Sequence, residues 1–258
     1  MGALEVPVSA PALSTRGLAM SFGSLVVARD IGLSLPVGAR YALIGPNGAG
    51  KTTLINLMTG MLMPNAGQIF LGDEDITALE PQQRVRRGLA RTFQINSLFA
   101  GLNALEAVTL VVAERRGIAG IFWQNIAVHR EAIEEAYDIL ARLRLDDCCY
   151  QATRELPYGR QRLLEIALAL ATKPKVLLLD EPAAGVPQEE SGDIFDVVSS
   201  LSEGLTLLFI EHDMHVVFRF ATHIIVMVGG TIFTEGSPAE IAVNPGVREV
   251  YLGKRKHG

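Results

Sequence analysis

The chain has 258 residues, 49% of them hydrophobic, and a formal net charge of -5 at pH 7. That length and apolar share allow one large domain or two modest ones with a full-sized core. The mild acidity, spread along the chain, argues against a nucleic-acid binder, which normally has a concentrated basic face. No apolar run reaches the roughly 20 residues that a membrane-spanning helix needs, so we expect a cytosolic protein that only a partner holds at a membrane.

The two ends of the chain and its cysteines show no chemistry of their own. Residues 1–16 lack the charged start and apolar centre of a signal peptide, and we expect a flexible leader over residues 1–12. Residues 254–258 are expected to be a solvated basic tail. Cys148 and Cys149 are adjacent and are the only cysteines, which disfavours a disulfide and leaves too few ligands for structural zinc.

The first part of the chain predicts strands that lead into a glycine-rich loop. Short apolar runs broken by glycines over residues 17–35 indicate antiparallel strands. Residues 40–44 read as a short apolar strand, residues 45–50 as a glycine-rich turn, and residues 51–59 as a helix. Residues 68–71 are a further strand candidate.

The middle of the chain, from about residue 96 to residue 171, changes to helical apolar spacing. The apolar residues expected on one helix face are Ile133, Ala136, Tyr137, Leu140 and Leu143. The strands expected after this segment are residues 176–179, 205–210 and 223–228. The pair Gly229-Gly230 predicts a hairpin turn into residues 231–234. Helices that alternate with fully apolar strands indicate a mainly parallel sheet covered on both faces.

The strongest chemical signal is the run of residues 45–52, which satisfies G-x-x-x-x-G-K-[ST] between a predicted strand and a predicted helix. The glycines let backbone N–H groups turn toward phosphate oxygens, and the helix N-terminus adds positive potential. Lys51 is expected to reach the β- and γ-phosphates of ATP, and the Thr52 hydroxyl to bind Mg²⁺. The nucleotide-binding residues predicted here are Gly45, Pro46, Asn47, Gly48, Ala49, Gly50, Lys51, Thr52 and Thr53.

A second signal is the apolar run of residues 176–179, which ends in Asp180 and Glu181. A buried strand that ends in two carboxylates can place Asp180 near Mg²⁺ and Glu181 near the γ-phosphate, as general base for the attacking water. Such a pair is weak by itself, because strand ends often carry solvated acidic residues. Its combination with the glycine-rich loop at this separation makes it strong.

The segment Leu156-Pro157-Tyr158-Gly159-Arg160-Gln161 resembles the LSGGQ signature of the ATP-binding-cassette family, and the resemblance extends from about residue 13 to residue 253. It implies an α/β fold of the P-loop NTPase, RecA-like type. That fold has a mainly parallel sheet core, an N-terminal antiparallel β subdomain and a helical insert. The parts it implies are a nucleotide-binding core over residues 13–95 and 166–253, and a helical subdomain with the signature over residues 96–165.

The same resemblance implies roles for single residues. Phe22 matches the aromatic residue that stacks on adenine, Gln94 the Q-loop glutamine, and His212 the switch histidine. Ordinary alternatives are core packing for Phe22, a surface position for Gln94 and a local helix-start bond for His212. Tyr158 and Gly159 are expected to contact a nucleotide. The implied catalytic residues are Glu181, His212, Gln94 and Lys51, and the implied metal-site residues are Thr52, Gln94 and Asp180.

Two departures from the family pattern indicate a subfamily. Pro157 stands where a serine is usual and has neither hydroxyl nor N–H, and Tyr158 replaces a glycine. Residues 183–186, which occupy the D-loop position, lack the usual aspartate. With the Ile-Glu-His-Asp-Met run around His212 and a Val-Tyr-Leu-Gly ending, this pattern resembles the ATP-binding subunits of branched-chain amino-acid importers.

The resemblance implies an ATPase that couples hydrolysis of ATP to uptake of branched-chain or related amino acids through a separate transmembrane permease. The implied partners are that permease, a second ATP-binding subunit, identical or homologous, in a nucleotide-sandwich dimer, and indirectly a periplasmic or extracellular binding protein. The expected place is the cytoplasmic face of the membrane, with no nucleic acid. Alternatives are the ATPase of a urea, amide or aromatic-acid importer, of an exporter or lipopolysaccharide-type system, or a non-transport cassette ATPase.

Overall fold

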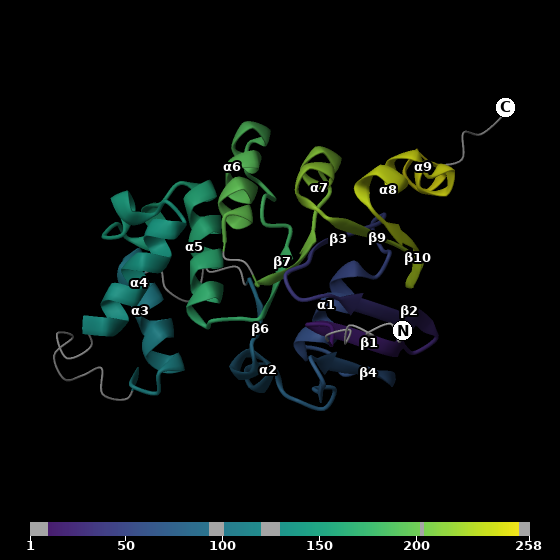
Figure 1. The fold of residues 1–258 in the computed structure, drawn as a ribbon, viewed down its shortest axis with the longest axis horizontal. Coiled ribbons are helices and arrows are strands. Elements are labelled where there is room, and N and C mark those ends of the chain that lie inside the picture. Colours follow the sequence, from purple (N-terminus) through teal and green to yellow (C-terminus); the bar gives the residue numbers. More distant parts are fainter. Residues whose placement is uncertain (1–9, 93–100, 120–129, 202–203, 253–258) are drawn as a thin grey trace, which may run out of the picture.

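The computed structural model describes residues 10–92, 101–119, 130–201 and 204–252. Gln94, residues 1–9 and the tail at residues 254–258 lie outside these ranges, so the expectations for them stay predictions. Figure 1 shows a molecule with a helical end and a β-rich end, and with the parallel sheet between them.

The N-terminal sheet is antiparallel and has the strand order β2-β1-β4-β5. Its strands are β1 (Leu13–Phe22), β2 (Leu25–Leu35), β4 (Ala66–Leu71) and β5 (Glu74–Asp75). The strands expected within residues 17–35 are thus confirmed. The backbone N–H of Ala12 already donates to the carbonyl of Leu35, so Ala12 extends this sheet and is not part of a flexible leader.

The second sheet has the order β10-β9-β3-β8-β7-β6. Its strands are β3 (Arg40–Ile44), β6 (Leu89–Arg91), β7 (Val176–Asp180), β8 (Thr206–Ile210), β9 (His223–Val228) and β10 (Thr231–Gly236). All neighbours pair in parallel except β9 and β10. These two are joined by Gly229 and Gly230, whose φ angles of 55° and 80° suit the tight hairpin turn that the sequence predicts.

Helices cover both faces of the parallel sheet (Figure 1). The helices of the described residues are α1 (Lys51–Thr59), α2 (Pro81–Arg87), α3 (Ala104–Arg115), α4 (Arg130–Arg142), α5 (Tyr158–Ala171), α6 (Gln188–Ser199), α7 (Met214–Phe220), α8 (Pro238–Val243) and α9 (Pro245–Leu252), with short 3₁₀ turns η3 (Asp146–Cys148) and η4 (Thr153–Glu155). One apolar core contains α1 and residues of both sheets, so α1 is buried between the sheets. A second core joins the other sheet face to α3–α7. None of the described helices has the length and apolar character needed to cross a membrane.

The buried stripe of α4 differs from the predicted face. Tyr137 is 42% exposed, and Ile133 is only half-buried. The stripe instead contains Ala132, Ala136, Ile139, Leu140 and Leu143. Its i, i+4, i+7 spacing is the ordinary helical period, so the helix is rotated relative to the expectation and the large phenol ring stays in solvent.

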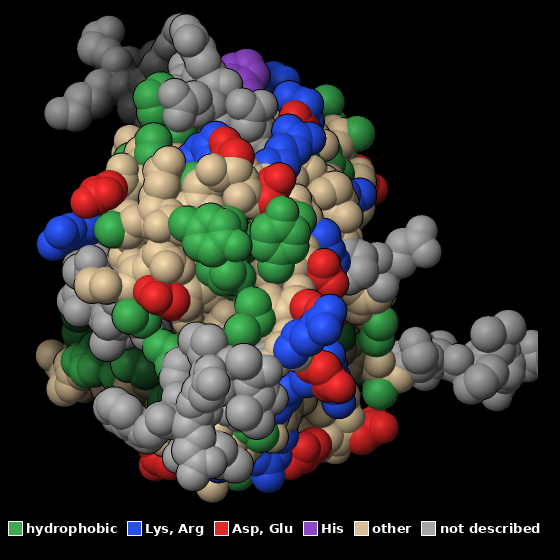
Figure 2. Space-filling view, turned by 90° about the vertical axis from the view of Figure 1, so that its left-hand side faces the viewer, with side chains coloured by type: hydrophobic (Ala, Val, Ile, Leu, Met, Phe, Trp, Pro, Cys, Tyr) green, Lys and Arg blue, Asp and Glu red, His purple; other side chains and the backbone are tan. Residues whose placement is uncertain are grey.

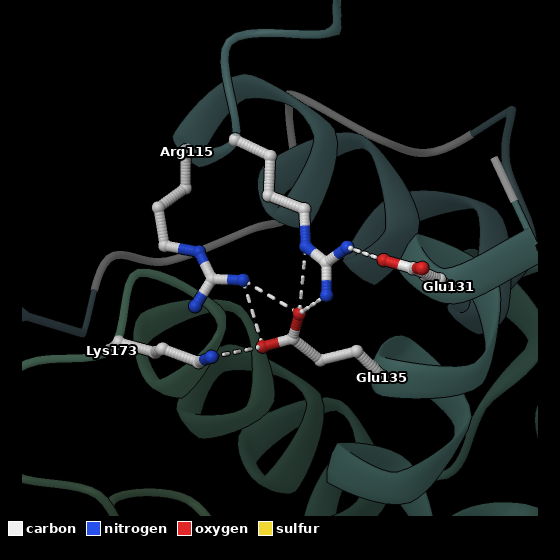
Figure 3. Close-up of polar contacts among 5 residues, drawn as sticks. Arg115, Glu131, Glu135 and Lys173 are labelled. Atoms are coloured by element: carbon white, nitrogen blue, oxygen red, sulfur yellow. Dashed lines mark hydrogen bonds and ion pairs between the residues drawn. The ribbon is translucent and has the colours of Figure 1, made fainter.

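An ionic cluster joins the helical insert to the chain just before β7 (Figure 3). Glu135 of α4 accepts hydrogen bonds from Arg115 at 2.7 Å and from Arg116 at 2.7 and 3.0 Å. The Lys173 ammonium, in the segment between α5 and β7, lies 3.0 Å from the same carboxylate. Burial raises the pKa of Glu135, but these hydrogen bonds and charges outweigh burial and lower the pKa to about 2. The charged carboxylate therefore links α3, α4 and the approach to β7.

Candidate active site

The glycine-rich loop follows β3, and its conformation requires glycine. Gly45 has φ 154°, and a Cβ there would lie 2.2 Å from the carbonyl oxygen of Met227. The Lys51 ammonium donates to the carbonyl oxygens of Gly45 and Pro46 at 2.7 and 3.1 Å. The side chain of Lys51 thus folds back over the loop, where the sequence predicts phosphate binding.

The N-terminus of α1 faces this loop. Gly50 is its N-cap and supplies no side-chain hydrogen bond to the first turn, and Thr52 in that turn is exposed. First-turn N–H groups have no acceptor within the helix, so they favour an anion. Burial lowers the pKa of Lys51, and the charges of Glu181 and Asp180 act in the opposite direction. The loop, the helix end and two carboxylates therefore belong to one site.

Asp180 is the last residue of β7, and it is paired with an arginine that the sequence analysis did not single out. Arg91, at the end of β6, lies 2.5 Å from the Asp180 carboxylate and donates to Asn56 of α1 at 2.6 Å. In the sequence, Arg91 stands three residues before the predicted Q-loop glutamine. Its closeness to that glutamine was the one feature of the sequence that could have indicated a role for Arg91 in the site. Arg91 joins three elements around the predicted metal-site carboxylate.

Glu181 and His212 are brought together by strand order. Asp180 ends β7 and His212 follows β8, and these strands are neighbours with Asp180 opposite Ile210. The N–H of Glu181 donates to the Ile210 carbonyl at 3.1 Å, and Glu181 has the left-handed φ of 50°, unusual outside glycine. Its Oε1 lies 2.8 Å from Nε2 of His212. The ring of His212 therefore contacts Glu181 across two strands, which differs from the alternative of a local helix-start bond.

A cavity of about 420 Å³ contains several of these groups. It is lined by Thr52, Met61, Arg91, Thr92, Arg162, Glu165, Asp180, Glu181 and Ala184. Tyr158 and Gly159 are not among the described residues that line it. Phe22 ends β1 and is 50% exposed, which excludes the core-packing alternative and leaves a free aromatic face.

The donors present fit a magnesium ion that is bound together with a nucleotide. Mg²⁺ is usually held by one or two carboxylates, phosphate oxygens and waters, not by a cage of protein ligands. Thr52 supplies a hydroxyl and Asp180 a carboxylate on the same cavity. Across the described residues, no three His, Cys, Asp or Glu side chains form a candidate metal cluster.

The fold and this site define a class of protein. The solved structure of a nucleotide-free ATP-binding cassette from an ABC transporter superposes with a TM-score of 0.83 at 33% identity. The match covers 94% of this chain and 99% of that chain. The ADP conformation of the cassette MJ1267 gives the same values. The predicted P-loop fold with an antiparallel sheet and helices is therefore confirmed, and the molecule is an ATP-binding cassette.

Sequence comparison gives the family. Residues 28–184 match the family model described as ABC transporter, and residues 232–257 match the model described as branched-chain amino acid ATP-binding cassette transporter. The high-affinity branched-chain amino acid transport ATP-binding proteins BraF of Pseudomonas aeruginosa and LivG of Escherichia coli are each 38% identical over 256 residues. These matches cover 96% of this chain and 100% of each relative. The chain belongs to the ABC transporter family and is an ATPase subunit of that family.

Proposed function

We propose that this chain binds ATP with Mg²⁺ and hydrolyses it to power uptake of branched-chain amino acids through a separate permease. One observation carries the ATPase assignment. The phosphate loop follows β3, Asp180 ends β7 and Glu181 follows it, and His212 follows β8; these three strands are consecutive in the sheet. The carboxyl ends of parallel strands meet at one edge, where α/β proteins bind their ligands.

The residues have distinct roles in this proposal. Lys51 and the first-turn N–H groups of α1 stabilise charge on the phosphates. Glu181 accepts a proton from the attacking water, and His212 holds the Glu181 carboxylate through its ring nitrogen at 2.8 Å. Mg²⁺, when bound near Thr52 and Asp180, neutralises phosphate charge. Phe22 offers its exposed face to adenine, and Gln94 stays a predicted contact to metal and water.

Two protein partners follow from surfaces away from this cavity. Tyr158 and Gly159 begin α5 and do not line the cavity of their own subunit, which supports a role for them in the ATP site of a second cassette. Figure 2 shows the helical-insert end, where hydrophobic side chains gather among charged ones. Tyr137 and Tyr150 of this insert are 42% and 76% exposed. Exposed aromatic side chains on the insert suit a permease that holds the chain at the cytoplasmic face of a membrane.

The substrate assignment rests on the relatives, which are branched-chain amino acid transport ATP-binding proteins, and on the match of residues 232–257. The test is uptake of labelled leucine into vesicles that contain the chain with its permease and binding protein. We expect uptake that needs ATP inside and that unlabelled isoleucine reduces by competition. Competition by urea or phenylalanine instead, or loss of label from loaded vesicles, would overturn this substrate or direction.

The ATPase assignment has its own test. Glu181→Gln should bind ATP with wild-type affinity and hydrolyse it roughly 10²–10⁴-fold more slowly, the usual effect of losing a general base. Binding is measured with a fluorescent nucleotide and hydrolysis by phosphate release. Near-normal turnover in this variant would remove Glu181 from its role.

A further inference from the structure

Glu211 is a buried carboxyl group between β8 and His212, and the roles above do not use it. It is 6% exposed. One of its oxygens accepts from the N–H of Ala183 at 3.1 Å and the other from the N–H of His212 at 3.2 Å. A single side chain therefore fastens the first residue of the D-loop to the backbone of the switch histidine.

Tyr158 lies against the other end of the same loop. Gly185 has φ 79°, and a Cβ on it would lie 2.9 Å from Cε1 of the Tyr158 ring. The tyrosine ring therefore covers this glycine, and both residues are departures from the family pattern. The two departures are complementary, because a side chain at position 185 would overlap the ring.

The ring of Tyr158 is held from within α5. Arg162 donates a hydrogen bond to the tyrosine hydroxyl, and its guanidinium carbon lies 4.9 Å from the ring centroid. Arg162 is itself 7% exposed and donates to Glu165 at 2.8 Å. A buried ion pair thus fixes the ring at the start of α5, so the position of the ring follows the position of the helix.

The D-loop, in turn, is hydrogen-bonded to the backbone of Glu181, the predicted catalytic base. The N–H of Ala184 donates to the carbonyl of Glu181 at 3.0 Å, and the N–H of Val186 donates to that of Ala183 at 3.1 Å. Glu181 is already in a left-handed backbone conformation, which persists only where its surroundings enforce it. A shift of the loop would therefore change the direction of the Glu181 side chain.

We propose that Tyr158 and Glu211 are positioning residues that hold the D-loop from its two ends and so keep Glu181 directed at His212. The proposal rests on the proposed function, in which Glu181 is the base. In this arrangement the position of α5 also affects Glu181 and His212 of the same subunit. Movement of the helix end at Tyr158 reaches Glu181 through Gly185 and Ala184.

The first experiment compares Tyr158→Ala with Tyr158→Phe. Removal of the ring should lower kcat about 10- to 100-fold, the scale expected for a small misplacement of a reacting group. ATP binding by the isolated subunit should be unchanged, because the ring does not line the cavity of its own subunit. Hydrogen exchange of the amides of Ala184 and Val186 should become faster. The phenylalanine keeps the ring over Gly185 and should retain most of the activity. Normal kcat and normal amide exchange in Tyr158→Ala would overturn the proposal.

Gly185→Ala tests the contact itself. We expect a large loss of kcat in the wild-type background, because the new Cβ overlaps the ring. In the Tyr158→Ala background the same substitution should cost much less, because the space is free; what remains is the strain of alanine at positive φ. Equal losses in both backgrounds would show that the contact with the ring is not what matters.

Glu211→Gln tests the other end of the loop. The two N–H groups bind different oxygens of Glu211, and glutamine replaces one of these acceptors by an NH₂ donor that faces an N–H group, so kcat should fall while KM is unchanged. Glu155→Gln, at an exposed carboxyl, is the matched control and should leave kcat as it is.

If Glu181→Gln is active, the proposed function fails. If Glu181→Gln is inactive while Tyr158→Ala and Glu211→Gln turn over normally, only this inference fails. If Glu211→Gln does not fold, the two Tyr158 variants decide.

Discussion

The ionic cluster around Glu135 predicts a pH-dependent part of the stability that can be worked out from its pKa. Glu135 is 15% exposed, and its pKa is lowered from 4.5 to about 2. One pKa unit corresponds to about 1.4 kcal/mol, so the shift corresponds to about 3 kcal/mol as an upper bound. Because Lys173 and Arg116 can regain water when the charge is removed, we expect Glu135→Gln to lower the free energy of unfolding by about 1–3 kcal/mol at pH 7.

The sign follows from the direction of the shift. A carboxyl group with a lowered folded-state pKa stabilises the protein above its unfolded-state pKa, and that stability is lost as pH falls toward the folded-state pKa. The difference between wild type and Glu135→Gln should therefore be constant above about pH 5.5, decline below about pH 4.5, and be more than halved near pH 3.

Urea unfolding followed by circular dichroism at several pH values measures this difference. Glu131→Gln is the control, because Glu131 is 85% exposed and makes a single ion pair with Arg116 (Figure 3). It should change stability by less than about 1 kcal/mol. Glu135→Gln as stable as wild type at pH 7, or a difference that is the same at pH 7 and pH 3, would refute the reasoning.

Three further predictions concern the site and its partners. Lys51→Ala should weaken ATP binding and hydrolysis together, because Lys51 supplies the cation over the phosphate loop; normal binding by fluorescent nucleotide would contradict the loop assignment. In the Glu181→Gln background, ATP and Mg²⁺ should produce dimers in sedimentation, and Gly159→Asp should abolish them by adding bulk and negative charge. Dimers that persist with Gly159→Asp would show that the signature segment does not lie in the ATP-dependent dimer interface. Tyr150→Glu should reduce copurification with the permease while ATP affinity is unchanged; undiminished copurification would exclude this patch as the docking face.

The phosphate loop and the core strands could be predicted from sequence because their physics is local. The phosphate loop needs glycine at position 45 and lysine at position 51, and both lie within one short stretch of sequence. The loop is found where expected, between β3 and α1. Fully apolar runs such as residues 176–179 become strands because both faces of a parallel sheet are covered. The face of α4 was harder, because Tyr137 and Ile139 are both hydrophobic and lie two positions apart, on different faces of the helix, so only packing decides which of them is buried.

The contacts that complete the candidate site were decided by the tertiary structure. The sequence alone determined the loop, the acidic strand end and the histidine as separate pieces. Only the strand order β3-β8-β7-β6 brings His212 to Glu181 and Arg91 to Asp180, and it puts residues far apart in the chain at hydrogen-bonding distance. The contact between Tyr158 and Gly185 likewise depends on where α5 packs. Such pairs leave no local pattern, because crossover connections separate in sequence the strands and helices that packing places side by side.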